Sequence, residues 1–339
     1  MDGDPTWLER YSRQITLEPM AEEGQRRLRE ATVVVVGAGA LGSNSADLLV
    51  RMGIGSVRII DRDVVELSNL HRFRVLGEPH LDLSKADALG GELANSFPDA
   101  SVAGVAEDLT AGNVLGLLEG ADVVIDGLDN MGTRYIVNDA CLELGIPWVY
   151  GGVVGTTGME APFPVDGPCL RCLFPEPPDP GVLPTCESAG IHPSTPAVVA
   201  AIQVAHASRI LTGASVESRL TTMDLWSDYW RTVDLQRRED CPACSEGRRE
   251  FLEAGSGEIA TSLCGQDAVQ INPPRRTSID MDAKEREWAS LGKVVRSGPV
   301  LTLDLGDLRL QLFPSGRALV KGTAEVAVAK TLYARYVGH

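Results

Sequence analysis

The chain has 339 residues, 44% of them hydrophobic, and a net charge of −16. Such a chain can bury a large core, and its acidic surface would repel nucleic acid phosphates, which argues against a DNA or RNA partner. No apolar run approaches the roughly 20 residues of a membrane helix, and the first residues lack the basic start and apolar stretch of a signal peptide, so we expect a cytoplasmic protein without membrane contact.

Strand-like and helical segments alternate over the first two thirds of the chain. Short β-branched runs such as Ala31–Val36 are typical of parallel strands buried on both faces. In chain order we expect a helix over 18–29, a strand over 31–36, a helix over 43–52, strands over 56–60 and 121–125, a helix over 134–144, a strand over 147–150 and a helix over 195–211. This alternation predicts a Rossmann-like α/β fold with a doubly wound, mostly parallel sheet.

The composition changes twice beyond this region. Prolines crowd residues 162–184, which predicts a long crossover over the surface near 162–190. After residue 244 a Gly/Glu stretch leads into a weaker mixture of helical and alternating segments. We therefore expect a main domain over 1–248 and a small C-terminal α+β appendage over 249–339, whose role the sequence does not indicate.

A G-x-G-x-x-G motif, formed by Gly37, Gly39 and Gly42, lies between the first strand and its helix. Glycines there let backbone amides and a helix N-terminus approach phosphate groups closely. Asp61 follows 19 positions after Gly42, where its carboxylate can accept hydrogen bonds from ribose hydroxyls. The motif alone fits NAD as well as ATP and, taken by itself, favours an NAD-dependent oxidoreductase.

The residues after Asp61 point away from a dehydrogenase. Asn69, Arg72 and Lys85 place an amide and two cations where a triphosphate would extend from the ribose. Transfer at phosphorus needs such groups, because charge develops on the phosphate oxygens. The alternative is that Arg72 and Lys85 are ordinary solvated surface charges.

The segment Asp126-Gly-Leu-Asp129-Asn130 follows another buried strand, so it emerges at the carboxyl edge of the sheet, where ligands usually bind. A carboxylate there can hold Mg²⁺ together with substrate phosphates. A turn or helix-cap role is the alternative reading.

Two C-x-x-C pairs dominate the pattern of the seven cysteines, an odd number that argues against a disulfide framework. Cys169 and Cys172, with Cys241 and Cys244, can supply four thiolates to one structural zinc ion. A redox C-x-x-C is the competing interpretation.

The remaining cysteines stand outside these pairs. Cys186 follows the proline-rich connection, where its thiol could act as a nucleophile or simply be a small half-buried residue. Cys141, within the expected helix, and Cys264, without basic neighbours, are expected to be structural.

The motifs RYSRQ, GAGALGSNSADLLVRMGIG, DRDVVELSNLHR, Lys85, DGLDN, CLRC, TCESAG and CPAC occur in that order. Together they resemble the ThiF/MoeB/HesA family, relatives of the ubiquitin-activating enzymes, over about residues 10–244. The resemblance implies ATP-dependent adenylation of the C-terminal glycine of a ubiquitin-like sulfur carrier ending in Gly-Gly, which activates it for thiocarboxylate or thioester formation. A non-catalytic scaffold that binds nucleotide and carrier is the alternative within the family.

The resemblance also implies roles for individual residues. It assigns Gly37, Gly39 and Gly42 to the nucleotide loop, Asp61 to the ribose, Asn69, Arg72 and Lys85 to the phosphates, Asp129 with Asn130 to the Mg²⁺ and nucleotide, the four paired cysteines to zinc, and Cys186 to thioester or acyl-disulfide chemistry.

The chemistry fits this set, because a C-terminal carboxylate is already ionised at neutral pH and needs no general base to attack phosphorus. His71 is therefore expected to be incidental.

In the family's dimers an arginine from the N-terminal segment reaches the partner's nucleotide. We expect Arg13 to be that residue, with Arg10 and Gln14 holding the segment in place, and so expect a homodimer. The tail has no rhodanese-type loop in which a cysteine is followed by a closing arginine, so an external sulfur donor is expected.

Overall fold

A computed structural model describes residues 5–178, 189–253, 260–263, 267–271 and 278–337. These residues form two compact units. The first contains residues 5–81 and 85–253, and the second contains 82–84 and the described residues from 260 onward.

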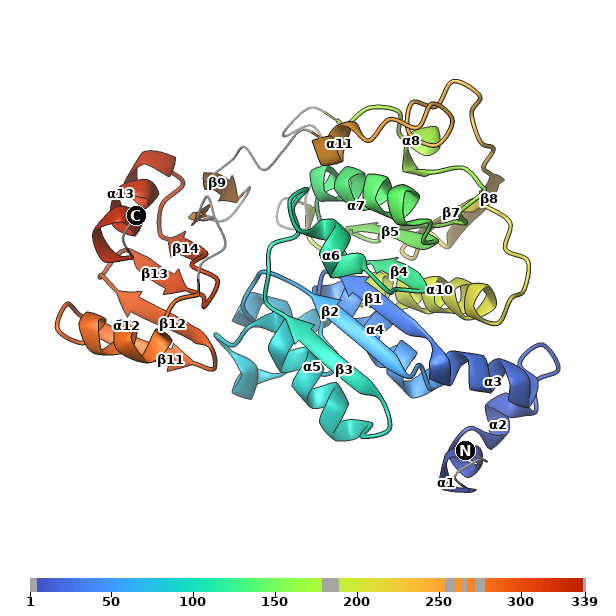
Figure 1. Cartoon of the computed structure of the whole chain (residues 1–339), viewed down its shortest axis with the longest axis horizontal. Helices are drawn as coiled ribbons and strands as arrows, with labels where there is room; N and C mark the ends of the chain where they lie inside the picture. The colour runs from blue at the N-terminus through green and yellow to red at the C-terminus, as the bar shows by residue number, and fades with distance from the viewer. Residues whose placement is uncertain (1–4, 179–188, 254–259, 264–266, 272–277, 338–339) are drawn as a thin grey trace. The chain divides into compact units, whose positions relative to one another are not determined.

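The first unit is built on an eight-stranded sheet in the order β3-β2-β1-β4-β5-β6-β7-β8 (Figure 1). The five strands from β3 to β5 in this order pair in parallel, and β6, β7 and β8 add an antiparallel edge. The strands are β1 (Thr32–Val36), β2 (Ser56–Ile60), β3 (Ser101–Val105), β4 (Val123–Asp126), β5 (Trp148–Val154), β6 (Thr157–Phe163), β7 (Arg219–Asp224) and β8 (Tyr229–Asp234). The α/β prediction with a mostly parallel sheet is confirmed, and the antiparallel edge goes beyond it.

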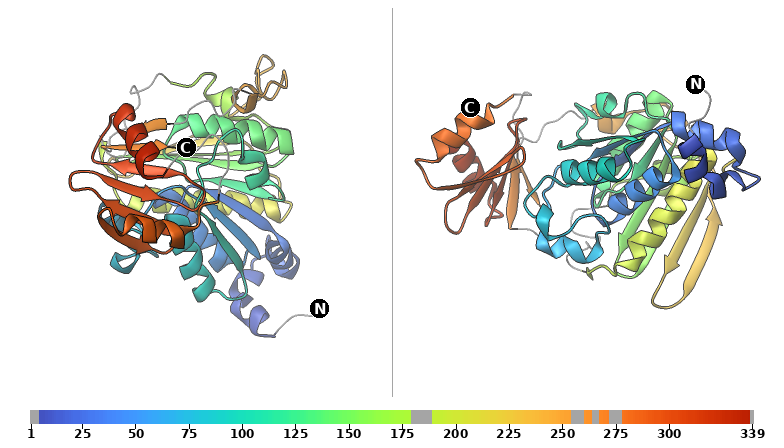
Figure 2. Two further views of the ribbon diagram at one scale, coloured as in Figure 1. Left: turned by 60° about the vertical axis from the view of Figure 1, so that its left-hand side comes forward. Right: turned by 90° about the horizontal axis from the view of Figure 1, so that it is seen from below.

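Helices cover both faces of this sheet (Figure 2). Val33 and Val35 of β1 pack in one core with α4 and α10, whereas Val34 and Val36 pack in the other with α6 and α7. The helices are α1 (Pro5–Arg10), α2 (Ser12–Ile15), α3 (Ala21–Glu30), α4 (Ala40–Met52), α5 (Lys85–Ser96), α6 (Val114–Leu118), α7 (Met131–Leu144), α8 (Leu170–Leu173), α10 (Ser194–Leu211) and α11 (Glu250–Glu253). Because β1 is buried on both faces, its successive residues Val33 to Val36 must all be apolar.

Two helices begin closer to the sheet than the sequence suggested. Helix α4 begins at Ala40, inside the glycine motif, rather than at Ser43. Helix α7 begins at Met131 rather than Arg134, because the Asn130 side chain caps it by accepting a hydrogen bond from the Thr133 amide. Both helices therefore present their free N-terminal amides at the carboxyl edge of the sheet.

The second unit contains a six-stranded antiparallel sheet in the order β11-β12-β13-β14-β10-β9. Helices α12 (Met281–Trp288) and α13 (Val326–Tyr336) share its core, in which the Trp288 indole N–H donates to the Tyr336 carbonyl over 2.8 Å. The strands are β9 (Ala260–Leu263), β10 (Ala268–Ile271), β11 (Lys293–Ser297), β12 (Val300–Asp304), β13 (Arg309–Leu312) and β14 (Ala318–Lys321).

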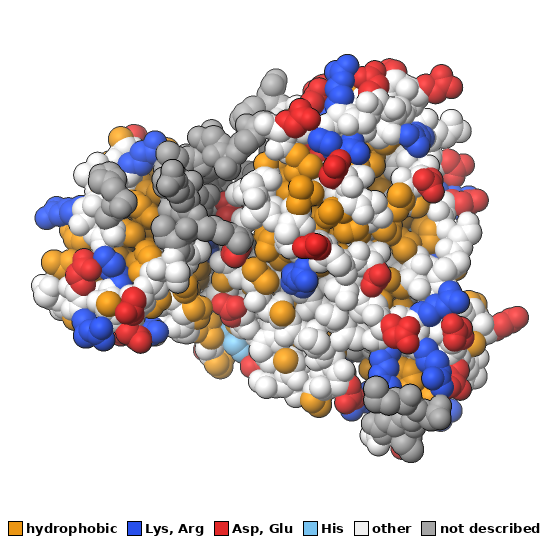
Figure 3. Space-filling model, in the orientation of Figure 1, with side chains coloured by type: hydrophobic (Ala, Val, Ile, Leu, Met, Phe, Trp, Pro, Cys, Tyr) orange, Lys and Arg blue, Asp and Glu red, His pale blue; other side chains and the backbone are white. Residues whose placement is uncertain are grey.

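Acidic and basic side chains are interspersed over the molecular face in Figure 3. Pairs one helical turn apart, such as Arg26 with Glu22 and Arg27 with Glu23 in α3, place opposite charges next to each other on the surface. In the part of the chain that the structure describes, no helix is both long and apolar enough to cross a membrane.

The core of the second unit gives a test of this packing. We predict that Leu303→Ala, at a fully buried position of β12, lowers the free energy of unfolding of this unit by about 3 kcal/mol, because it leaves a cavity. Leu291→Ala, at a position 50% exposed in the same unit, should cost less than about 0.5 kcal/mol. Hydrogen exchange of the β12 and β13 amides measures both, and equal costs would contradict the fold.

Candidate functional site

The loops after β1 and β4 lie side by side at the carboxyl edge of the sheet. Strand β1 pairs with β2 on one side and with β4 on the other, so the chain winds away from β1 in both directions. In open α/β sheets, ligands bind in the crevice at such a switch point. The glycine motif follows β1, and the segment 127–130 follows β4.

Three glycines allow these two loops to approach each other. A Cβ on Gly42 would lie 1.8 Å from the Gly37 carbonyl oxygen, and a Cβ on Gly127 would lie 2.7 Å from the same atom. Gly37 also has a φ of +94°, which a side chain rarely permits. Around Gly39 a Cβ would meet no described atom within 4 Å. Packing therefore accounts for three glycines and leaves the backbone at Gly39 accessible to a ligand.

Asp61 and Lys85 come together beside this loop. The Asp61 carboxylate accepts hydrogen bonds from the Ala38 amide at 2.5 Å and the Asp63 amide at 2.6 Å. Burial raises the pKa of Asp61, and the nearby Lys85 ammonium partly offsets this. Burial alone would lower the pKa of Lys85, but the carboxylates of Asp63 and Asp61 outweigh it and raise that pKa above its usual range. Lys85 is therefore held as a cation at this edge.

The same cluster contains charged residues that sequence reasoning missed. Lys85 Nζ lies 3.2 Å from Asp63 Oδ2, and Arg62 Nη1 donates to Asp108 Oδ1 at 3.1 Å. Asp63 lies two positions after Asp61, the residue predicted to bind the ribose. This spacing was the only local pattern that could have indicated Asp63. Asp108 follows β3 and gave no signal, because only the fold brings it to Arg62.

Asp129 lies at the exposed end of the β4 loop, directly before α7. Its negative charge favours the charged forms of Lys85, Arg62 and Arg134, which places all four in one electrostatic neighbourhood. Asn130 is the helix cap, and its Nδ2 donates to Asp129 Oδ1 at 3.3 Å. An exposed carboxylate at this edge can hold a divalent metal ion together with substrate phosphates.

A buried ion pair fixes the β4 loop. Arg134 Nε donates to Asp126 Oδ2 at 2.8 Å, and the two side chains are only 7% and 0% exposed. Arg134 Nη2 also donates to the carbonyls of Leu128 and Gly151, at 2.6 and 2.7 Å. Burial raises the pKa of Asp126, while Arg134 acts in the opposite direction. Asp126 stood in the acidic segment that we considered for Mg²⁺, but its pairing with Arg134 was not predicted, and Arg134 was not a candidate.

Other predicted nucleotide residues lie nearby in sequence but are held within their own turn. Asn69 is buried in the 3₁₀ turn Leu67–Arg72, where its Oδ1 accepts from the Glu66 amide at 3.4 Å. Arg72 Nη1 donates to the Ser68 carbonyl at 3.1 Å, and His71 is exposed. Among the described contacts, none joins Arg72 to the Lys85 cluster.

The N-terminal segment is anchored to the end of α4. Gln14 Nε2 donates to the Met52 carbonyl at 2.8 Å and to Gln25 Oε1 at 2.5 Å, and Arg10 Nη1 pairs with Asp99 at 2.6 Å. Arg13 is exposed on α2. Arg13 is thus exposed to solvent in the single chain that the structure describes, whereas Arg10 and Gln14 make contacts that hold the segment.

The two C-x-x-C pairs meet in space. The Sγ atoms of Cys169, Cys172, Cys241 and Cys244 all lie within 4.8 Å of one another. The Cys169–Cys241 and Cys172–Cys244 sulfur pairs are 3.7 and 3.5 Å apart. Tetrahedral zinc with Zn–S bonds of about 2.3 Å places its ligands about 3.8 Å apart, so this donor set fits zinc.

The remaining cysteines divide between the core and the undescribed parts of the chain. Cys141 is buried in α7, as expected for a structural residue. Burial raises the pKa of its thiol, which favours the neutral form. Cys186 and Cys264 lie outside the described residues.

A model of the ThiF family matches residues 11–243. The chain belongs to the ThiF family. The sulfur carrier protein ThiS adenylyltransferase of Bacillus subtilis (strain 168) is 38% identical to this ThiF-family chain over 335 residues, which cover 97% of this chain and 99% of that protein. The SAMP-activating enzyme E1 of Haloferax volcanii is 39% identical over 252 residues, 74% of this chain and 93% of that protein.

The fold of this ThiF-family chain also occurs in a solved structure. A crystal structure of E. coli MccB with ATP superimposes with a TM-score of 0.61 over 72% of this chain and 75% of that one, at 19% identity. At this identity the likeness concerns the fold.

The buried ion pair of the β4 loop gives a testable stability difference. We predict that Arg134→Met lowers the free energy of unfolding by about 3 kcal/mol, because it leaves the buried Asp126 without its counter-charge. Arg219→Met removes an arginine that is 50% exposed and pairs with Glu217 and Asp234, so it should cost under about 1 kcal/mol. Urea denaturation measures both, and equal losses would show that the Arg134 pair is not buried as described.

Proposed function

We propose that this chain catalyses the ATP-dependent adenylation of the C-terminal glycine of a ubiquitin-like sulfur carrier ending in Gly-Gly. The observation that carries the proposal is the cluster of Lys85, Asp61 and Asp129 beside an accessible glycine loop in a chain of the ThiF family. The two curated relatives reported above carry the names of a sulfur-carrier adenylyltransferase and an activating enzyme, which favours this reaction over hydride transfer to NAD. We assign the activity to residues 1–248.

The proposed step forms one bond and breaks one. An oxygen of the ionised glycine carboxylate attacks the α-phosphorus of ATP, the bond from that phosphorus to the bridging oxygen breaks, and pyrophosphate leaves with the electron pair. The acyl-adenylate that results is open to attack by sulfur.

This chain's residues supply the charge that the step requires. Lys85, now paired with Asp63, would turn to the phosphates, and Arg72 and Asn69 would contact them from the 3₁₀ turn. Asp61 would accept from the ribose, and the amides at Gly37, Gly39 and Gly42 would approach the phosphates. Asp129, beside Asn130, would hold Mg²⁺, which when bound neutralises charge on the pyrophosphate leaving group.

The metal and the partners belong to the same proposal. Cys169, Cys172, Cys241 and Cys244 would hold a structural zinc ion that the reaction does not use. We propose that the sulfur donor is a separate molecule. We also propose that the Cys186 thiolate can attack the carbonyl carbon of the acyl-adenylate, so that a thioester forms, the bond from that carbon to the phosphate oxygen breaks and AMP leaves. A cytoplasmic location fits a reaction that consumes ATP and a site built from reduced thiolates.

Isotope exchange between pyrophosphate and ATP tests the adenylation. We predict exchange that depends on a carrier ending in Gly-Gly and falls by about 100-fold in Lys85→Ala, because a positioned cation is lost from the transition state. Lys330→Ala, at an exposed position of α13, is the matched control and should retain full exchange. Exchange that persists without a carrier, or that Lys85→Ala leaves unchanged, would reject the proposed reaction.

The place of Arg13 is tested by mixing subunits. If the protein is a homodimer in which Arg13 reaches the partner's nucleotide, each site combines Lys85 of one subunit with Arg13 of the other. A mixed dimer of Arg13→Ala and Lys85→Ala subunits then has one intact site of two and should recover about half of the wild-type exchange rate. Each variant alone should stay inactive, and a purified mixed dimer without activity would assign Arg13 to the surface.

A further inference from the structure

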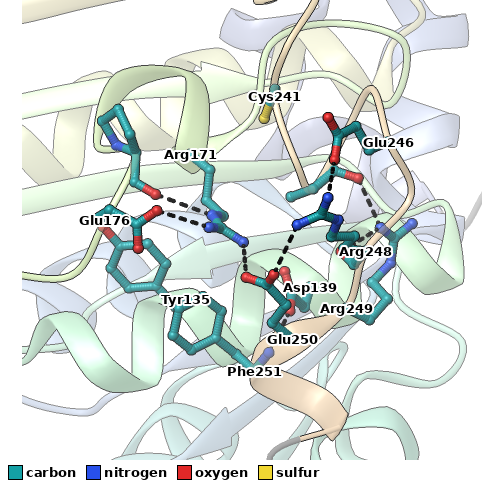
Figure 4. Close-up of polar contacts among 12 residues, drawn as sticks. Tyr135, Asp139, Arg171, Glu176, Cys241, Glu246, Arg248, Arg249, Glu250 and Phe251 are labelled. Carbon is teal, nitrogen blue, oxygen red and sulfur yellow. Dashed lines mark hydrogen bonds and ion pairs between the residues drawn. The ribbon is translucent and has the colours of Figure 1, made fainter.

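The arginine between two of the metal-ligand candidates is buried in a way the proposed reaction does not explain. Arg171 stands between Cys169 and Cys172, and its side chain is only 2% exposed. Arginine is rarely buried to this extent unless its guanidinium is paired. Figure 4 shows that guanidinium between Glu176 and Glu250.

Arg171 joins the residues that follow its own loop to α11, which lies far along the chain. Its Nη1 donates to Glu250 Oε2 at 2.7 Å in α11, and its Nε donates to the Pro175 carbonyl at 3.1 Å just after α8. Its Nη2 lies 3.4 Å from Glu176 Oε1, and the guanidinium lies 5.4 Å from the ring centroid of Phe251. The planar fork of arginine can serve all these partners at once, which a lysine cannot do.

Helix α7 supports the same segments from the side of the sheet. Tyr135 Oη donates to the Phe174 carbonyl at 2.9 Å, Asn138 Oδ1 accepts from the Leu170 amide at 2.9 Å, and Asp139 Oδ2 accepts from the Phe251 amide at 2.9 Å. The Tyr135 and Phe251 rings also pack 4.7 Å apart, as Figure 4 shows. The helix that begins beside Asp129 therefore also holds the loop of Cys169 and Cys172 and the start of α11.

We propose that Arg171 is a positioning residue that locks the Cys169–Cys172 loop, the adjoining Pro175 and Glu176, and α11 into one rigid support for the metal site. The proposal rests on the proposed zinc site. Without the guanidinium, Pro175, Glu176 and Glu250 lose their common partner, and among the described residues only the contacts through α7 still connect the Cys169–Cys172 loop to α11. Groups that orient metal ligands typically change metal affinity by 10- to 100-fold when they are removed.

Zinc release to a chromogenic chelator tests the proposal on the full-length protein. Arg171→Met keeps most of the apolar stem and removes only the guanidinium, and it should release zinc about 10-fold faster than wild type. Arg171→Lys can keep only the pair with Glu250, so its rate of zinc release should lie between those of wild type and Arg171→Met. Arg248→Met is the matched control, because Arg248 also contacts Glu250, at 3.5 Å, but is 59% exposed, and it should release zinc at the wild-type rate.

A second readout does not depend on metal or activity. Hydrogen exchange of peptides covering residues 172–178 and 249–253 should accelerate in Arg171→Met, with α4 peptides unchanged. Glu250→Gln, at a half-exposed position, should give a smaller acceleration of the same peptides and serves if Arg171→Met does not fold. Combined with Arg171→Met, it should add little, because both changes break the same pair.

The outcomes separate this proposal from the others. Zinc release and local exchange at wild-type rates in Arg171→Met, or effects no larger than those of Arg248→Met, would overturn it. Additive effects of Glu250→Gln and Arg171→Met would also contradict it. Purified wild-type protein without zinc would reject the proposed zinc site. In that case, unchanged hydrogen exchange in Arg171→Met would also reject the positioning role of Arg171. None of these measurements depends on carrier adenylation.

Discussion

The backbone contact between the glycine loop and the β4 loop is the constraint on which the candidate site depends. Gly42 and Gly127 both approach the Gly37 carbonyl so closely that a side chain on either would collide with it. The buried pair of Asp126 and Arg134 then fixes the β4 loop from beneath. Removing two charges from water is costly, and additional hydrogen bonds must offset that cost. The carbonyls of Leu128 and Gly151 supply them, so the loop that ends at Asp129 has one defined path.

Helix α7 connects the two chemical features of the first unit. Its N-terminus follows Asp129 and Asn130, and its outward face holds the cysteine loop and α11 through Tyr135, Asn138 and Asp139. A metal site at this place would stabilise the helix whose first turn borders the proposed nucleotide site. In the proposed reaction the cysteine cluster would thus act through the position of α7 and not through contact with the phosphates.

The residues of the proposed nucleotide site all lie in the first unit. The match with the Bacillus subtilis relative covers 97% of this chain and so includes most of the second unit, whereas the match with the Haloferax volcanii relative covers 74% of this chain and 93% of that protein. The second unit has its own core around Trp288 and Leu303. The match with the Haloferax volcanii relative therefore leaves about a quarter of this chain uncovered, whereas the match with the Bacillus subtilis relative leaves almost none.

Much of the sheet could be predicted because its signals are local. Four valines in succession after Thr32 indicate a strand buried on both faces, and the glycine motif marks the turn that follows. The spacing of the cysteine pairs predicted a cluster that the fold brings together. The antiparallel edge of β6 to β8 was not predicted. In β6, Gly158 and Pro162 interrupt the alternating pattern.

The supporting contacts of the site could not be predicted from local patterns. Lys85 pairs with Asp63, and Arg62 with Asp108, only because segments 22 and 46 residues apart become neighbours. Asp126 pairs with Arg134, eight residues further on, because the β4 loop turns the chain back into α7. Arg171 was not predicted to have a role, because its partner Glu250 lies far along the chain. Spacing identifies groups that bind one ligand together, whereas the residues that hold them in place depend on the complete fold.

The central claim is that the carboxyl edge between β1 and β4 binds the nucleotide. Hydrogen exchange of the full-length protein, measured with and without ATP·Mg²⁺, tests it most directly. The account predicts slower exchange in residues 37–42, 61–72 and 127–133, and no comparable change in the second unit. Slowing confined to the second unit, or slowing at these loops by NAD and not by ATP·Mg²⁺, would contradict it.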